Sequence, residues 1–255
     1  MCYFHIYLAF CAAEVSDWAS MKAHVDKLRA TAKILDVPLA GPLGNFALYL
    51  AGVYHQGVGD LDTALHIFQD AKFDLPDLQS SNLSAANQFI RDVSLLAALN
   101  TIWILQHADR QDHYVNTTLI TKLAEICESH PNKDIQTAYN LVVATVNVNP
   151  HAPLIKIKKY LGNALAGAKA TGNTQFICFT LNIMCGKFFA NVVGEQAEKS
   201  AMAASMQAKK SGNVLWMSVA EGMLAQCYDV NGKKEKASNT FEQAQMLAQK
   251  ALPEA

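Results

Sequence analysis

The sequence predicts an all-α fold, an α-solenoid of about six antiparallel helix pairs. Apolar residues recur at helical spacing in segments that are separated by short polar breaks. Alternating β-branched runs of the kind that form strands do not recur. One short stretch also returns forty residues later: AKATGN at 168–173 is followed by Phe176, and AKKSGN at 208–213 is followed by Trp216. Self-similarity of this kind is typical of repeat proteins.

The pattern places twelve helices at residues 1–13, 17–35, 43–57, 61–73, 84–107, 114–129, 132–148, 154–171, 174–191, 194–211, 214–230 and 234–251. Asp17 and Asp60 each precede a helix and can cap its first amides. Gly172-Asn173 and Gly212-Asn213 are typical of a left-handed helix end that is followed by a new helix. These signals predict short connections between antiparallel neighbours.

Composition favours one continuous folded body over a disordered or multi-part chain. Of the 255 residues, 51% are hydrophobic and 17% are charged, and the glycines and prolines form no linker-like tract. We therefore expect a single helical-repeat domain over 1–255, and the apolar stretch 1–13 suggests that it is part of a longer superhelix. No basic residue precedes Lys22, which argues against a signal peptide. We also expect no apolar run that is long enough to span a bilayer.

The near-neutral net charge of −1 hides an uneven distribution. Residues 1–155 carry 9 Lys and Arg against 15 Asp and Glu, whereas 156–255 carry 12 Lys against 7 acids. The basic half has no arginine and its lysines are spread widely, which is weaker than a nucleic-acid-binding signature. Six scattered cysteines without a CxxC motif are interpreted as buried thiols in a reducing compartment.

Small residues recur in a fixed order that is typical of tetratricopeptide repeats. A small residue in the first helix of a pair is followed twelve positions later by alanine in the second helix, which lets the two backbones approach closely. The three pairs of positions are Gly52 and Ala64, Cys185 and Ala197, and Ala225 and Ala237. Phe68 and Phe241 follow at the same offset and are expected to fill the space beside the crossing. Ala201 occupies that position in the middle unit.

Three stretches resemble one protein family. They are LYLAGVYHQGVGDLDTA at 48–64, HPNKDIQTA at 130–138 and GEQAEKSAMAAS at 194–205. They are similar to the C-terminal part of the tetratricopeptide-repeat subunit of the fungal cohesin loading factor. The resemblance implies a nuclear, chromatin-associated scaffold in sister chromatid cohesion and chromosome segregation. Its partner would be the extended N-terminal segment of the large HEAT-repeat subunit of the cohesin loader.

The chain shows no pattern that predicts catalysis or a cofactor. Neither a GxxxxGK[ST], a GxGxxG, a GxSxG nor an HExxH sequence occurs. His107, Asp109, Asp112 and His113 cluster between two predicted helices, where a solvated polar loop explains them more simply than a metal site. We therefore expect no enzyme, no cofactor and no metal.

Two sets of surface residues are candidates for binding. Helix positions that face the inner curve of a repeat array predict a partner-binding set: Tyr49, Val53, Gln56, Phe179, Asn182, Phe189 and Gln226. A second, basic set could meet acidic protein segments or DNA phosphates: Lys156, Lys158, Lys159, Lys209, Lys210, Lys233 and Lys234. Two other functions stay open, a regulatory tetratricopeptide domain of a transcription factor or signalling ATPase, and a hydrolase or metalloenzyme. The first needs a further module and the second needs a convergent polar pocket.

Overall fold

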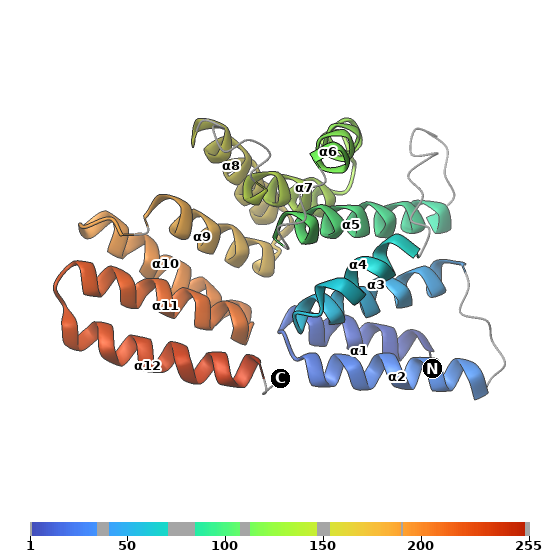
Figure 1. The fold of residues 1–255 in the computed structure, drawn as a ribbon, viewed down its shortest axis with the longest axis horizontal. Helices are drawn as coiled ribbons and strands as arrows, with labels where there is room; N and C mark the ends of the chain where they lie inside the picture. The colour runs from blue at the N-terminus through green and yellow to red at the C-terminus, as the bar shows by residue number, and fades with distance from the viewer. Residues whose placement is uncertain are drawn as a thin grey trace. The chain divides into compact units, whose positions relative to one another are not determined.

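A computed structural model describes residues 2–34, 41–70, 85–107, 113–146, 154–189 and 191–252, and these form twelve helices without a strand (Figure 1). The helices are α1 (Cys2–Glu14), α2 (Trp18–Ile34), α3 (Gly41–Gly57), α4 (Leu61–Asp70), α5 (Ala85–His107), α6 (His113–Cys127), α7 (Lys133–Thr145), α8 (Leu154–Thr171), α9 (Thr174–Phe188), α10 (Glu195–Ser211), α11 (Val214–Val230) and α12 (Lys234–Ala251). The all-α prediction is confirmed. No helix end within the described residues lies more than three residues from its predicted position.

The chain divides into two compact units. Unit 1 comprises residues 1–13 and 17–158, and unit 2 comprises residues 14–16 and 159–255. Helices α2 to α7 belong to unit 1 with nearly all of α1, α9 to α12 belong to unit 2, and α8 contains the boundary. Each unit is described by itself below.

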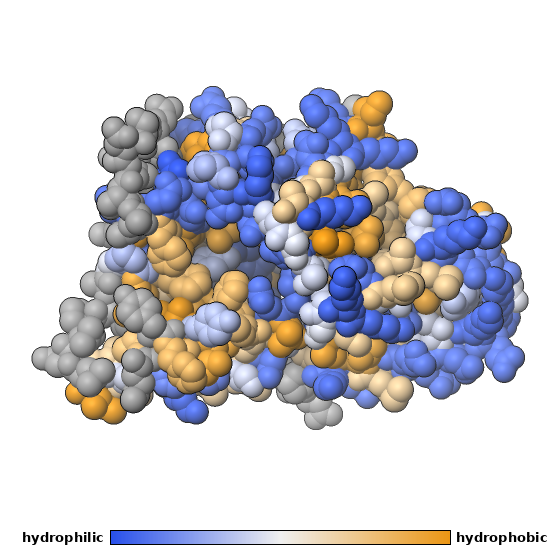
Figure 2. Space-filling view, turned by 180° about the vertical axis from the view of Figure 1, so that it is seen from behind, coloured by the Kyte–Doolittle hydropathy of each residue, from blue (hydrophilic) through white to orange (hydrophobic). Residues whose placement is uncertain are grey.

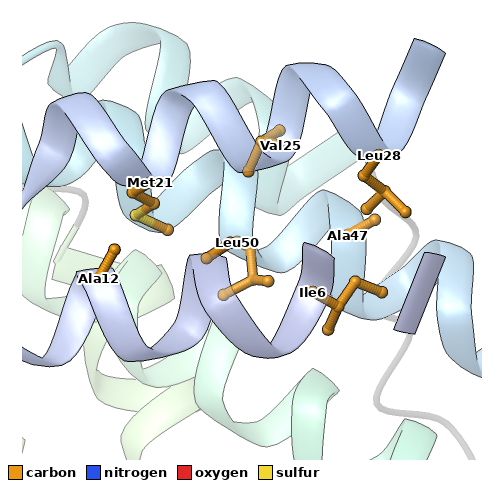
Figure 3. Packing of buried hydrophobic residues seen from close by; sticks show 8 residues of the cluster. Ile6, Ala12, Met21, Val25, Leu28, Ala47 and Leu50 are labelled. Atoms are coloured by element: carbon orange, nitrogen blue, oxygen red, sulfur yellow. The ribbon is translucent and has the colours of Figure 1, made fainter. Parts of the chain in front are cut away.

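The first three helices of unit 1 share one apolar core. Figure 3 shows side chains of α1, α2 and α3 converging between the helices. The core residues labelled there are Ile6, Ala12, Met21, Val25, Leu28, Ala47 and Leu50. The indole of Trp18 lies so close to Gly57 that a Cβ added there would come within 2.6 Å of it. Close packing of this kind leaves no room for a side chain at that glycine.

The contact between α3 and α4 depends on one glycine and one aromatic ring. A Cβ placed on Gly52 would lie 2.4 Å from the Phe68 ring, and Phe68 is only 2% exposed. Helix α5 joins the same cluster through Ala97, Ile104 and Leu105, which are all buried. The α3–α4 pair therefore provides a surface that the following helix occupies.

Helix α5 corrects one expectation from the sequence. The window Asn87–Gln106 is long and apolar enough to cross a membrane by length and composition, so the expectation that no such run exists was wrong. Of this window 56% is buried inside the structure. A core helix that is covered by neighbours has the same composition, and the contacts of α5 with α3 and α4 account for it.

A polar cluster joins α5 to the turn between α6 and α7. The backbone N–H of Asn132 donates to Nδ1 of the buried His130 (3.1 Å), so the neutral ring carries its proton on Nε2, which lies 3.2 Å from Asp92 Oδ1. The Gln136 amide donates to the His130 carbonyl at 2.6 Å. Burial lowers the pKa of His130, and the charge of Arg91 adds to this while Asp92 opposes it. The stretch 130–138 thus has a structural role, as a helix start that is fixed to α5.

Unit 2 is a stack of antiparallel helices, and α9 to α12 follow one another as neighbours in Figure 1. The seam is made of small residues, because α10 buries alanine at positions 197, 201, 204 and 208. The repeated stretches have the same geometry in both copies. Gly172 and Gly212 take left-handed backbone angles (φ 69° and 72°), and the next residue caps the helix. The side chains of Asn173 and Asn213 each accept a hydrogen bond at 3.0 Å from the amide three residues later.

The α3–α4 and α11–α12 pairs have equivalent residues that are separated by 173 positions in the sequence, as Gly59 and Gly232 are. Both glycines take left-handed angles (φ 85° and 75°). In both turns the residue after the glycine donates its N–H at 2.9 Å to the carbonyl five positions earlier. Helix α11 (Val214–Val230) matches α3 (Gly41–Gly57) at both ends under this offset. The two pairs are therefore copies of one structural unit.

One side chain departs from the expected arrangement. Ala237 and Ala244 of α12 are buried as predicted, but Phe241 is 53% exposed and does not fill the space beside the crossing. The facing helix also differs, because Ala225 stands at the position of Gly52. A Cβ at that position occupies the space that the Phe68 ring takes in the first pair. The Phe68 ring is in addition covered by α5, a contact for which Phe241 has no counterpart among the described residues.

Candidate protein-binding surface

Unit 1 carries aromatic side chains on three alternate helices of the chain, α1, α3 and α5. Phe4, Tyr7 and Phe10 project from α1 and are 61%, 65% and 41% exposed, although α1 buries Ile6, Ala9 and Ala12 in the core. Helix α3 adds Phe46 and Tyr49, and α5 adds Phe89. We call these six residues the aromatic surface. Figure 2 shows apolar side chains gathered over the first helices.

Ring contacts connect this surface across the helices. Phe46 lies at its centre, with ring centroids 6.4 Å from Phe10, 6.1 Å from Tyr49 and 5.3 Å from Phe89. The Phe46 and Phe89 rings meet edge to face with an interplanar angle of 73°, an arrangement that aromatic pairs prefer. Because the rings of Phe10, Phe46, Tyr49 and Phe89 contact one another, this part of the surface is preorganised and loses little side-chain entropy on binding. Exposed apolar patches of this kind mark interaction sites.

The partner-binding residues predicted in unit 1 lie on or beside the aromatic surface. Tyr49 belongs to it, and its hydroxyl accepts a hydrogen bond from Asn100 of α5 at 3.3 Å. Burial raises the pKa of Tyr49 to about 12, so this hydroxyl stays protonated near neutral pH. Val53 is half-buried and packs against the clusters below, and Gln56 is half-buried one turn later on α3. Their role in binding stays a prediction.

Helix α1 is expected to cause self-association of the isolated chain. Its exposed Phe4 and Tyr7 present large apolar area to water, which favours association with another apolar surface. We expect the apparent mass from light scattering to rise with protein concentration, and the double variant Phe4→Ser/Tyr7→Ser to abolish most of that rise. A chain that stays monomeric at every concentration tested would contradict this expectation.

The candidates in unit 2 are dispersed. Phe179 packs edge to face on Trp216 with ring centroids 4.4 Å apart, and Phe189 packs against a core cluster of α9, α10 and α11. Asn182 is buried and donates to the carbonyl of Cys178 on its own helix at 2.9 Å. Gln226 is exposed and donates to the Asn191 side chain at 2.7 Å. Phe179 and Phe189 thus pack against neighbouring helices, and a binding role for these four residues stays a prediction.

Several lysines of the basic set are paired with carboxylates within unit 2. Lys209 lies 2.6 Å from the buried Glu221, which also accepts a hydrogen bond from Ser205 at 2.7 Å. Lys233 lies 2.6 Å from Glu198. Such pairing reduces the net positive potential that an acidic partner would meet.

The other lysines of the basic set differ in their neighbours. Lys234 lies 2.7 Å from Asp229, and Lys210 is exposed on the last turn of α10. Lys156, Lys158 and Lys159 are exposed on the first turns of α8. Contact with acidic segments or DNA stays a prediction for all seven lysines.

Four of the six thiols lie in the interior of the protein. Cys127, Cys178, Cys185 and Cys227 are buried as predicted, and Cys2 and Cys11 are half-buried. Burial raises the pKa of Cys127 to about 12 and that of Cys185 to about 11, so these thiols stay protonated near neutral pH.

No group of three or more potential metal ligands occurs within the described ranges. Of the predicted polar loop, Asp109 and Asp112 lie outside those ranges.

Of the residues in ring contact on the aromatic surface, the sequence singled out Tyr49 as a candidate but not Phe10, Phe46 or Phe89. The three residues lie far apart in the chain, and only the packing of α1, α3 and α5 brings their rings together. One signal was present: Phe46 lies one helical turn before Tyr49 and therefore on the same face of α3.

Comparison with known proteins identifies the family. The family model described as "Cohesin loading factor" matches residues 1–235, which is most of the chain. Searches among curated proteins and among solved structures found no significant match. The matched range includes α1 to α11, and with them the whole aromatic surface. This chain belongs to the cohesin loading factor family, whose role is in cohesin loading.

Proposed function

We propose that this chain is a non-catalytic scaffold that holds the extended N-terminal segment of the large HEAT-repeat subunit of the cohesin loader. It thereby helps to direct cohesin to chromatin in the nucleus. Residues 1–255 act in this proposal as one tetratricopeptide-like domain of a longer superhelix. Family membership supports the process. The shared turns of α3–α4 and α11–α12 support the repeat type, because their glycine turns and small crossing residues follow the tetratricopeptide order.

The aromatic surface is the observation on which the proposal depends. An extended segment has few contacts within itself, so its binding depends on a small number of anchor residues that become buried in the complex. Aromatic rings are the side chains that most often supply such anchors at protein interfaces. Phe10 and Phe89 each expose 41% of their surface and contact Phe46 between them. Apolar residues of an extended chain could therefore pack along α1, α3 and α5.

The test measures binding of the N-terminal segment of the large subunit to the 255-residue chain by isothermal titration calorimetry. The double variant Phe10→Ser/Phe89→Ser is expected to weaken binding at least tenfold, because each ring buries apolar area in the complex. Both rings are partly exposed, so the variant is expected to fold, and circular dichroism and thermal melting check this.

A matched control is Phe241→Ser in α12, which removes an exposed phenylalanine from unit 2. It should leave the affinity for the segment unchanged. Unaltered binding by the Phe10→Ser/Phe89→Ser variant would remove the aromatic surface as the contact site. Absence of any binding by the folded wild-type chain would refute the scaffold function itself.

A further inference from the structure

A groove lies on α11 and α12. It has a volume of about 530 Å³, and its lining includes Gly222 and Gln226 of α11 and Lys234, Ser238 and Phe241 of α12. We call it the α11–α12 groove. It lies entirely within unit 2 and shares no residue with the aromatic surface.

The repeat design relates this groove to a surface in unit 1 that a helix occupies. At the offset of 173 residues, the lining residues Gly222, Gln226, Lys234, Ala237, Ser238 and Phe241 correspond to Tyr49, Val53, Leu61, Ala64, Leu65 and Phe68. All six of the latter belong to the cluster that packs with α5. The α11–α12 groove therefore corresponds to the surface of α3 and α4 against which α5 packs.

The same arrangement occurs once more in unit 2. The α9–α10 pair presents Cys185, Ala197 and Ala201, and α11 packs on them through Leu224 and Cys227. In both described cases a helix covers the surface that a pair presents. Two antiparallel helices form a shallow channel that matches the ridge of a third helix, which explains why the occupant is a helix and not an extended strand.

From this correspondence we infer that the α11–α12 groove binds one amphipathic α-helix of a protein partner. The partner helix carries a bulky apolar residue at the position where α5 has Asn100. This inference does not rest on the proposed function, because it concerns a different surface and a partner of different chemistry.

The bulky anchor follows from the exchange of Tyr49 for Gly222. In unit 1 the Tyr49 ring fills the space between the helices, and its hydroxyl meets the small polar Asn100 of α5 at 3.3 Å. In unit 2 the equivalent position is Gly222, which supplies no ring, and no atom from another helix lies within 4 Å of the place where its Cβ would be. A helix that binds there has to supply the missing ring from its own side. Phe241, which is half-exposed, provides the apolar partner for that ring.

Charge in the groove points to the same occupant. Among the lining residues the only charged ones are Asp229 and Lys234, and they pair with each other at 2.7 Å. The groove is therefore close to neutral. A neutral groove complements an uncharged helix face and offers nothing to the phosphates of a nucleic acid or to an acidic tail. Ser238 and Gln226 stand where α4 and α3 have Leu65 and Val53, so uncharged polar residues are expected beside the anchor.

The test uses a designed helix as the probe. A fluorescein-labelled, stapled peptide carries residues 90–107 of α5 with Asn100→Phe and with its outward-facing apolar residues replaced by Lys or Glu. Binding to the 255-residue chain is measured by fluorescence polarisation. We expect the Asn100→Phe peptide to bind at least tenfold more tightly than the same peptide with Asn100, since only the former fills the space above Gly222.

Two protein variants locate the binding. Gly222→Tyr restores the ring of the first pair and is expected to weaken binding of the Asn100→Phe peptide at least tenfold. Phe241→Ser removes the apolar partner and is expected to weaken it as well, with an intact fold confirmed by thermal melting. Phe10→Ser/Phe89→Ser, on the aromatic surface, should leave the peptide affinity unchanged, which separates this result from the test of the proposed function.

Several outcomes would overturn the inference. Failure of the wild-type chain to bind the Asn100→Phe peptide is one, and equal binding by wild type and Gly222→Tyr is another. Sedimentation velocity supplies a third: a wild-type dimer that Gly222→Tyr converts to a monomer would identify a second copy as the occupant of the groove.

Discussion

Gly52→Ala is expected to lower the free energy of unfolding by up to about 2 kcal/mol. A Cβ at this position would lie 2.4 Å from the Phe68 ring, which is enclosed by α3, α4 and α5 and cannot move into solvent. Overpacking of this kind costs about 1–3 kcal/mol, and the higher helix propensity of alanine offsets about 1 kcal/mol of it. Urea unfolding, followed by circular dichroism at 222 nm, measures the change.

Two further variants isolate the contact with Phe68. Gly162→Ala in α8 adds the same methyl group where nothing lies within 4 Å, and it is expected to raise stability by up to about 1 kcal/mol. The double variant Gly52→Ala/Phe68→Leu should lose less stability than the sum of the two single changes, because the smaller side chain leaves room for the methyl group. Strict additivity in this cycle would show that the ring does not cause the loss.

His130→Gln is expected to lower the free energy of unfolding by about 1–3 kcal/mol at pH 7.5. The change removes the acceptor of the Asn132 N–H and the partner of Asp92, and unpaired buried polar groups cost about this much. The wild-type chain should also depend on pH in this region. Its folded state keeps His130 neutral because burial lowers the pKa, whereas the unfolded chain binds a proton near pH 6.5.

The direction of the pH effect follows from this difference. The unfolded state binds more protons as the pH falls below about 6.5, so the contribution of His130 is complete above that value and decreases toward the lowered pKa of the folded state. Thermal melting at pH 7.5, 6.5 and 5.5 measures this slope, which His130→Gln should reduce. His66→Gln, at an exposed position of α4, is the matched control. An equal slope in wild type and His130→Gln would contradict the assignment.

Local features of the fold could be predicted from the sequence because they depend on neighbouring residues. The caps at Asp17 and Asp60 accept the amide three residues later, as expected. Gly172 and Gly212 end their helices in the left-handed conformation, as predicted, because glycine has no Cβ to oppose a positive φ. Helix spacing, turn glycines and small crossing residues thus determine the order and the pairing of the elements.

Features that depend on distant contacts could not be predicted in this way. Phe241 is half-exposed and Phe68 is buried, although both follow their crossing alanine at the same spacing, because α5 covers Phe68 alone. The aromatic surface requires rings from three helices to meet, and the partners of Lys209 and Lys233 lie on other helices. The sequence predicts a positively charged surface at these lysines, but the neighbouring carboxylates reduce the positive potential that a partner would encounter.

The buried thiols allow local opening of the structure to be measured by alkylation of the protein's own cysteines. With a pKa of about 12, Cys127 has a thiolate fraction on the order of 10⁻⁴ at pH 8, so the closed state resists alkylation. Modification therefore has to wait until the surrounding helices separate. Cys127 at the end of α6 samples unit 1, whereas Cys185 on α9 and Cys227 on α11 sample one shared core cluster of unit 2. The alkylation rate of each cysteine accordingly counts the openings of its own neighbourhood, without any added label.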